Sequence, residues 1–265
     1  SRSSDGSEKV DDEQVDDDDE SDVMMSEEEV KWRSMFSNSL SQQLKSVDQS
    51  FVIDHMKRYM WRRQRRGTSD SPRSTELTPD NFSDLVMNNQ NIATNVLKLL
   101  MEENANNASS RKKRTSLHQH PTEEYLKVLA NMQPLCIQSM EVMSSLFNHH
   151  HQLVEFTQEQ TTTASESAEK DEEDESPQID MQYYLGLYIH NAICSCDRMS
   201  SDTSMQKRLV RLLTVFLKSL IQRQILDVSN EKFNELILQI RTFCIQFSMI
   251  REASELFRLL DISRK

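Results

Sequence analysis

Histidines gather in the middle of the chain, where they could bind a metal ion. His149, His150 and His151 follow one another, and His118 and His120 lie upstream. Structural zinc sites use spaced His and Cys ligands that are held by fixed elements. Three adjacent histidines at the end of a predicted helix are more typical of a polar corner, so we expect no metal site here.

Thiols and a further histidine lie close together later in the chain. His190 and Cys194 are one helical turn apart, the spacing of a possible ligand pair, and Cys196 follows. Two steps along a helix turn a side chain by about 200°, so Cys194 and Cys196 cannot readily face one metal. We interpret both as core thiols. Together with Cys136 and Cys244 they show no disulfide framework, which favours a reducing, intracellular compartment.

Nucleophilic catalysis would need a nucleophile, a base that activates it and a group that orients the base. Cysteines and histidines are present, but no spacing in the sequence places them together. A nucleotide-binding turn needs clustered glycines, whereas Gly6, Gly67 and Gly186 lie far apart. The sequence therefore predicts no enzyme, no cofactor and no small-molecule ligand. No apolar run reaches the roughly 18 residues of a membrane span, so we expect none.

The segment 57–66, "KRYMWRRQRR", is strongly basic, with six bases in ten residues. It could hold RNA phosphates while Tyr59 or Trp61 stacks on a base. The candidate phosphate contacts are Arg62, Arg63, Arg65 and Arg66. The segment could equally be a nuclear localisation signal, a partner for the acidic arm of the chain, or a solvated helix end. RNA binding is therefore one interpretation among several, and "RKKR" at 111–114 leaves the same choice.

Charge and composition divide the chain into segments. Residues 1–29 contain fourteen acids and two bases, and the remaining 236 residues are neutral overall. Blocks of like charge normally stay solvated. The chain begins with Ser rather than Met, and we expect it to be a piece of a longer protein. The predicted organisation is a disordered acidic arm at 1–25, an amphipathic helix ending in the basic segment at 26–66, a linker at 67–77, and a helical partner-binding domain at 78–262 with flexible inserts at 102–120 and 157–178.

The amphipathic segment 26–66 begins with a capping box, Ser26 and Glu29. Trp32 and Phe36 start an apolar stripe that continues at helical spacing, with a break expected somewhere before the basic segment. The stripe could pack on the rest of the chain as an extra helix, or it could enter a groove on another subunit. The disordered flanks favour the second interpretation, in which Trp32 and Phe36 contact a partner.

Helical periodicity dominates from Thr78 onward, and "NNQ" at 88–90 predicts an interruption of the first helix. The stretch "RLVRLLTVFLKSL", from Arg208 to Leu220, has an apolar face but too many bases to cross a bilayer. The helix predicted at 230–247 also carries apolar residues off its main face, Leu238 and Ile245, so we expect it to be buried on two sides. The sequence predicts an all-α fold, either an antiparallel helical bundle or an irregular HEAT-like stack.

Partner binding would use a groove between stacked helices. We take the exposed side of the 204–225 helix as its rim, with Arg208, Arg211 and Lys218 steering acidic partners and Tyr183 or Tyr188 anchoring them. The alternative is that the tyrosines belong to the core and the bases are merely solvated.

A long ordered series of segments resembles a known family. The segments are "LTPDNFSDLVMNNQNIATNVLKLLM", "EEYLKVLANMQPLCIQSMEVMSSL", "YLGLYIHNAICSCDRM", "KRLVRLLTVFLKSLIQRQILDV" and "IRTFCIQFSMIREASELFRLL". They are similar to the C-terminal domain of subunit eleven of the Ccr–Not complex, which shortens messenger RNA poly(A) tails. The resemblance implies a non-catalytic scaffold in cytoplasm and nucleus.

That family pairs with subunit ten and docks on the large central scaffold subunit, mainly through residues upstream of this domain. The C-terminal domain is similar to a surface that recruits an additional protein. No catalytic residues, membrane or small molecule come with the resemblance. An RNA-binding regulator that uses 57–66 is the alternative.

Overall fold

The computed structural model describes most of the chain. The backbone is described at 27–66, 77–110, 121–133, 135–162 and 179–262, and within these stretches the side chains are described except at 59–66, 104–110, 121 and 154–162. In these stretches every regular element is a helix, which confirms the predicted all-α fold. The elements are α1 (Glu27–Ser41), α2 (Ser46–Arg66), α3 (Pro79–Ser110), α4 (Pro121–Ala130), α5 (Ile137–Thr162), α6 (Met181–Arg198), the 3₁₀ turn η1 (Met199–Ser201), α7 (Thr203–Gln222), the 3₁₀ turn η2 (Glu231–Phe233), α8 (Asn234–Gln246) and α9 (Arg251–Ile262).

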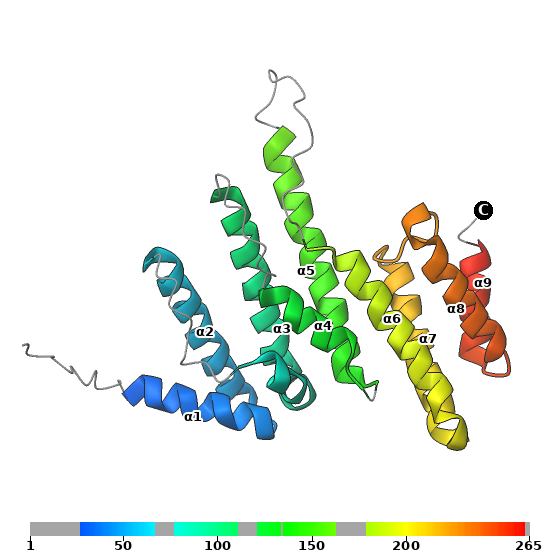
Figure 1. Cartoon of the computed structure of the whole chain (residues 1–265), viewed down its shortest axis with the longest axis horizontal. Coiled ribbons are helices and arrows are strands. Elements are labelled where there is room, and N and C mark those ends of the chain that lie inside the picture. Colours follow the sequence, from blue (N-terminus) through cyan, green and yellow to red (C-terminus); the bar gives the residue numbers. More distant parts are fainter. Residues whose placement is uncertain (1–26, 67–76, 111–120, 134, 163–178, 263–265) are drawn as a thin grey trace, which may run out of the picture.

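The helices form a two-layer stack (Figure 1). In one layer α3 packs on α5, α5 on α7 and α7 on α9; in the other α4 packs on α6 and α6 on α8. Contacts of α3 with α4, α5 with α6, α6 with α7, and α8 with α9 join the layers. Helices α1 and α2 pack on α3 at one end, and α8 and α9 form the other end (Figure 1). Of the two arrangements that the sequence leaves open, a helical bundle and an irregular stack, the structure shows a helical stack.

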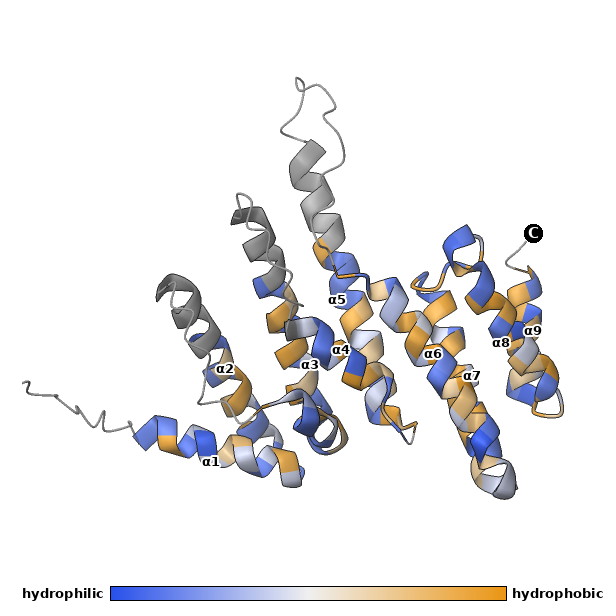
Figure 2. Ribbon diagram, viewed as in Figure 1, coloured by the Kyte–Doolittle hydropathy of each residue, from blue (hydrophilic) through white to orange (hydrophobic). Residues whose placement is uncertain are grey.

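Each helix combines hydrophobic and hydrophilic residues, as Figure 2 shows. In α7 the buried residues recur at helical spacing: Leu209, Val210, Leu213, Phe216, Leu217 and Leu220. Asp202 caps the start of this helix, because its carboxylate accepts hydrogen bonds from the amides of Ser204 and Met205. The buried faces of successive helices meet in one continuous hydrophobic core.

Helix α7 ends in a Schellman motif. Gln224 adopts a left-handed conformation, with φ of 59°. Its amide bonds the carbonyl of Ile221, and the amide of Ile225 bonds the carbonyl of Leu220. These two bonds satisfy carbonyls that the helix end would leave without partners and turn the chain toward α8.

Two helices, α3 and α5, end later than the apolar periodicity of the sequence predicts. The backbone of α3 is helical to Ser110 and that of α5 to Thr162, so both helices continue into the segments 102–120 and 157–178. Once a helix has started, adding a residue costs little, and the backbone can stay helical beyond the last buried turn. Apolar periodicity marks only the turns that face the core. The arm at 1–25 lies outside the described residues.

Candidate partner-binding surface

The stripe that begins at Trp32 is covered by the chain itself. The stripe is divided between α1 and α2, which are separated by a break at 42–45. Trp32 and Phe36 are buried and their rings stack, with centroids 5.6 Å apart, while Trp32 also stacks on His55 of α2 at 4.9 Å. The structure therefore corrects the expectation that Trp32 and Phe36 contact a partner: their apolar surface is used in packing α1 and α2 on α3.

Asn89 holds these two helices to α3. It is buried at the predicted interruption of α3, where its backbone leaves the helical region (φ −143°, ψ 63°). Its side-chain nitrogen donates to the carbonyls of Ser39 and Gln42, at 2.6 and 2.7 Å. Its side-chain oxygen accepts from the amide of Leu44 at 2.9 Å and from the amide group of Gln49 at 3.3 Å. One side chain thus satisfies the end of α1 and the α1–α2 turn.

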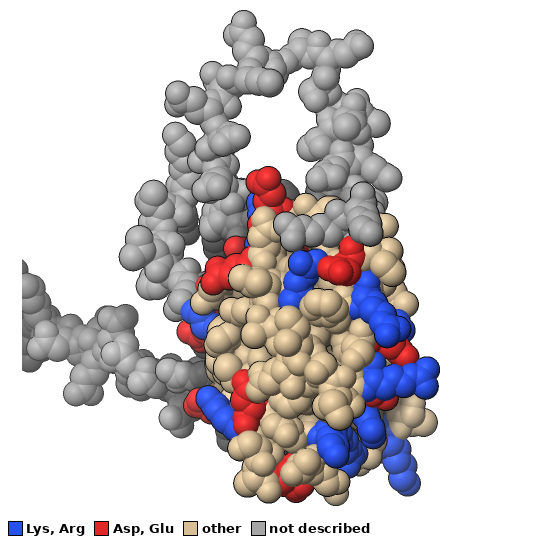
Figure 3. Space-filling model, turned by 90° about the vertical axis from the view of Figure 1, so that its right-hand side faces the viewer, with Lys and Arg blue, Asp and Glu red and all other residues tan. Residues whose placement is uncertain are grey.

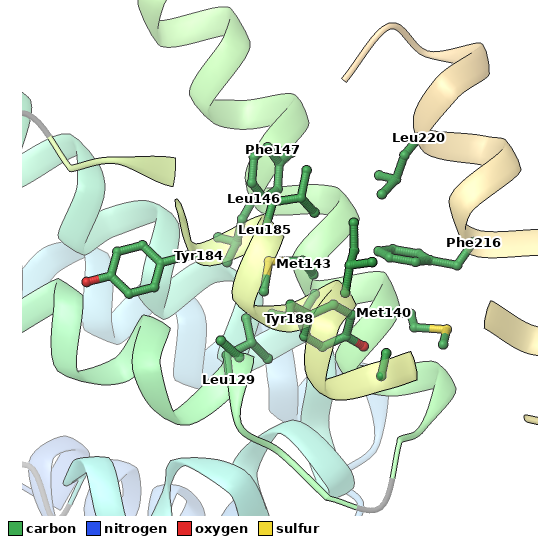
Figure 4. Packing of buried hydrophobic residues seen from close by; sticks show 14 of the residues in the cluster. Leu129, Met140, Met143, Leu146, Phe147, Tyr184, Leu185, Tyr188, Phe216 and Leu220 are labelled. Atoms are coloured by element: carbon green, nitrogen blue, oxygen red, sulfur yellow. The ribbon is translucent and has the colours of Figure 1, made fainter. Parts of the chain in front are cut away.

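The two tyrosines proposed as anchors have different environments. Tyr188 is 2% exposed and its hydroxyl lies 2.8 Å from that of Ser139, between α5 and α6. Burial raises its pKa well above the ordinary value. Its ring meets Phe216 edge to face at 5.7 Å, deep in the core shown in Figure 4. Tyr188 is therefore a core residue and not an anchor, whereas Tyr183 is 59% exposed.

The bases proposed for the rim do share one exposed face of α7. Arg208 and Arg211 are exposed, Lys218 is half-buried, and Val215 lies exposed between them. The guanidinium of Arg211 lies 3.5 Å from the carboxylate of Glu252 on α9. α7 contains no acidic residue. Tyr183 belongs to α6, in the other layer, so the structure separates this aromatic side chain from the cationic face.

A second surface was missed in the sequence. Leu238 and Ile245 of α8 are 65% and 62% exposed, so the expectation that this helix is buried on two sides is wrong. α8 is the outermost helix of its layer, with α6 on one side and α9 behind it, and nothing in the described chain covers its outer face. Met249, in the turn after α8, is 97% exposed. The sequence does show Leu238 and Ile245 away from the main apolar face of this helix. It does not show whether another part of the same chain covers them.

The metal and thiol candidates form no ligand set. Among the described residues, no three His, Cys, Asp or Glu side chains come together as a metal site would require. His149 lies 3.3 Å from Glu102, and burial lowers the pKa of His149 and of His150. The described helices also include none long and apolar enough to span a membrane.

Cys194 and Cys196 lie on different sides of α6, as predicted. The thiol of Cys194 is half-buried, 3.6 Å from the ring nitrogen of His190. Cys196 and Cys244 are buried, and burial raises the pKa of both thiols to about 12. The last two are core thiols in the chemical sense, since neither forms a thiolate at neutral pH.

The RNA candidates Arg62, Arg63, Arg65 and Arg66 have side chains outside the described residues, although α2 itself extends to Arg66. At the start of the basic segment, Arg58 lies 3.0 Å from Glu28 of α1. RNA contact by this segment stays a prediction.

Comparison with known proteins identifies the family. A model of the family described as CCR4-NOT transcription complex subunit 11 matches residues 86–261. A protein of that name from Dictyostelium discoideum is 40% identical over 79 residues, which are 30% of this chain and 11% of the relative. The match begins inside α3 and includes α4 to α9, so most of the stack, and more than half of the chain, follows the family pattern. The chain therefore belongs to the CCR4-NOT transcription complex subunit 11 family.

Proposed function

We propose that this chain is a non-catalytic adaptor of the CCR4-NOT complex, and that its helical stack recruits another protein to the machinery that shortens poly(A) tails. The observation that carries the proposal is the family match across the stack, from residue 86 to residue 261. A stack of helices around one core offers long, rigid surfaces of the kind that repeat proteins use for binding.

The cationic face of α7 supports recruitment of an acidic partner. Among the described residues, Arg211 lies 3.5 Å from Glu252 of α9, Lys218 acts electrostatically on Glu255 of the same helix, and Arg208 is exposed. Exposed charges of one sign speed the encounter with a partner of the other sign and fix its orientation more than they add affinity. Contacts with the other subunits, namely subunit ten and the large central scaffold, are proposed to involve residues upstream of this chain.

The test is to delete residues 27–265, which contain the whole stack, from the full-length subunit and to purify the complex from cells. We expect the other CCR4-NOT subunits to remain and one or more further proteins to disappear. The triple variant R208E/R211E/K218E should lose the same proteins while keeping its fold. Unchanged composition after removal of the stack would contradict the proposal, and so would poly(A) shortening by the purified chain alone.

The proposed role places the protein in both cytoplasm and nucleus. A fluorescent fusion of the full-length subunit checks this. Confinement to a membrane compartment or to the cell exterior would contradict it.

A further inference from the structure

The outer face of α8 carries a short row of exposed side chains at one end of the stack. The row consists of Leu238, Thr242 and Ile245, spaced by four and three residues, and the exposed Met249 follows in the turn after the helix. The hydroxyl of Thr242 donates to the carbonyl of Leu238 at 3.0 Å, so its hydrogen-bonding need is met within the helix. Single exposed apolar residues are ordinary, but an aligned row on a terminal helix is not, because terminal helices of stacked proteins normally present a polar outer face.

The spacing of the row matches another helix. Residues that recur by three and four lie along a narrow ridge, and such ridges pack into the grooves of a neighbouring helix. An extended peptide that adds to a sheet has no counterpart here, because the described elements include no strand. From Leu238 to Ile245 the row covers about two turns of α8, so it fits about two turns of a partner helix with its own apolar face.

The charges on α9, which adjoins α8, indicate which charges the partner helix should carry along one edge. α9, which packs on α8, carries two exposed bases, Arg251 and Arg258. The acids of α9 already lie near bases: Glu252 near Arg211, Glu255 near Arg251, and Asp261 near Arg241. Together α7, α8 and α9 contain seven bases and four acids, a net of +3. Figure 3, which views this end, shows a largely uncharged centre with Lys and Arg along one side.

We propose that the α8 row (Leu238, Thr242 and Ile245), with Met249 in the turn after it, is the docking site for an amphipathic helix of another protein, with Asp or Glu along the edge that lies over α9. This inference rests on the proposed recruiting function and names the surface and the partner class. The apolar row supplies the buried contact, and the arginines of α9 fix the direction of the bound helix.

The first experiment places a photoreactive benzoylphenylalanine at Met249 of the full-length subunit in cells. Light-dependent adducts are digested and the attached peptide is sequenced. We expect a segment of another protein with apolar residues at helical spacing and acids on one edge. An adduct to this same chain or to a second copy of it overturns the inference, and so does a peptide without that pattern or the absence of any adduct.

The second experiment synthesises the attached peptide and titrates it into the chain. Leu238→Glu and Ile245→Glu should each weaken binding at least tenfold, and Arg258→Glu should weaken it and reduce its dependence on salt. Val47→Glu, an exposed substitution on α2 at the opposite end, is the matched control and should change nothing. Thermal unfolding checks that each variant is folded. Equal affinity of all variants overturns the α8 site but leaves the recruiting function standing if R208E/R211E/K218E still loses its partners.

Discussion

The side-chain nitrogen of Asn89 lies 2.6 Å from the carbonyl oxygen of Ser39 and joins the kink of α3 to the last turn of α1. The substitution Asn89→Leu keeps the branched shape but removes all four hydrogen bonds of this side chain. It leaves the carbonyls of Ser39 and Gln42 and the amide of Leu44 without that partner, which should lower the free energy of unfolding by about 3 kcal/mol. Urea unfolding measures the change.

Hydrogen exchange then tests where the Asn89→Leu variant loses stability. Amides of α1 and α2 should exchange faster, while those of α7 to α9 keep their protection, because distant helices share no contact with Asn89. Asn38→Asp, an exposed change on α1, is the control. Equal acceleration throughout the chain would show that Asn89 is not a local clamp.

Two substitutions at Tyr188 distinguish the contribution of its ring to stability from that of its hydroxyl. Tyr188→Phe removes the bond to Ser139, but the hydroxyl of Ser139 can still donate to the carbonyl of Cys136 at 3.0 Å. We expect a loss of about 1 kcal/mol for Tyr188→Phe and about 4 kcal/mol for Tyr188→Ala, which leaves a cavity against Phe216. Chemical denaturation of both variants checks this order. Similar losses would mean that the hydroxyl, rather than the ring, carries the contribution.

Gln224 sits where glycine is normally preferred. Its left-handed conformation costs an ordinary residue about 1 kcal/mol, because the side chain crowds the following carbonyl. Gln224→Gly should therefore stabilise the protein by up to about 1 kcal/mol, partly offset by the greater freedom of glycine in the unfolded chain. The thermal midpoint should rise, whereas Gln222→Gly, at the last residue of α7, should lower it. A fall for both variants would contradict the αL assignment.

The buried thiols predict a loss of stability in alkali. Burial, with Asp197 adding to it at Cys196, raises the pKa of Cys196 and Cys244 in the folded protein to about 12, from an ordinary value of 9.0. Below pH 9 both thiols are neutral in the folded and in the unfolded chain, so their contribution to the free energy of unfolding is fully present. That contribution is lost as the pH rises from 9 toward 12, by at most about 1.4 kcal/mol per pH unit for each thiol.

Unfolding by urea at pH 8, 9 and 10 measures this slope, and Cys196→Ala should reduce it. A thiol reagent at neutral pH provides a second measurement. Cys136 and Cys194, which are half-buried, should react in the folded protein, and Cys196 and Cys244 only after unfolding. Rapid labelling of Cys244 in the native state would contradict its burial.

The ion pair between Arg211 and Glu252 should contribute little. Both side chains are more than a third exposed, and water and salt weaken such pairs. Arg211→Ala should change the free energy of unfolding by less than about 1 kcal/mol, and less still at high salt. A thermal scan at two salt concentrations checks this. The same scan of R208E/R211E/K218E checks that this variant tests recruitment rather than folding.

Periodicity predicted the helices well where one face is buried. The apolar row of α7 at Leu209, Leu213 and Leu217 is buried as expected, and the interruption near Asn89 is present. The same periodicity did not predict the helix ends of α3 and α5, since polar turns beyond the core leave no apolar signal. The family resemblance, carried by segments inside these helices, is confirmed by the match at 86–261.

The sequence did not predict which apolar side chains would be covered by this chain and which would remain exposed. An apolar side chain signals that it will be covered, but not by what: Trp32 is covered by this chain and Ile245 is not. Tyr183 and Tyr188 are five residues apart in one helix, yet only their orientation separates an exposed ring from a core ring. Arg208 and Arg211 lie on an exposed face as predicted, while their role in binding stays a proposal.

Because each helix of the two layers touches chiefly its immediate neighbours, cohesion in this molecule is local. Tension applied between the two ends should peel helix pairs away one after another, from whichever end is weaker, rather than break the whole molecule at once. A protein built this way should therefore lengthen under load in steps of one helix pair and shorten again when the load is removed.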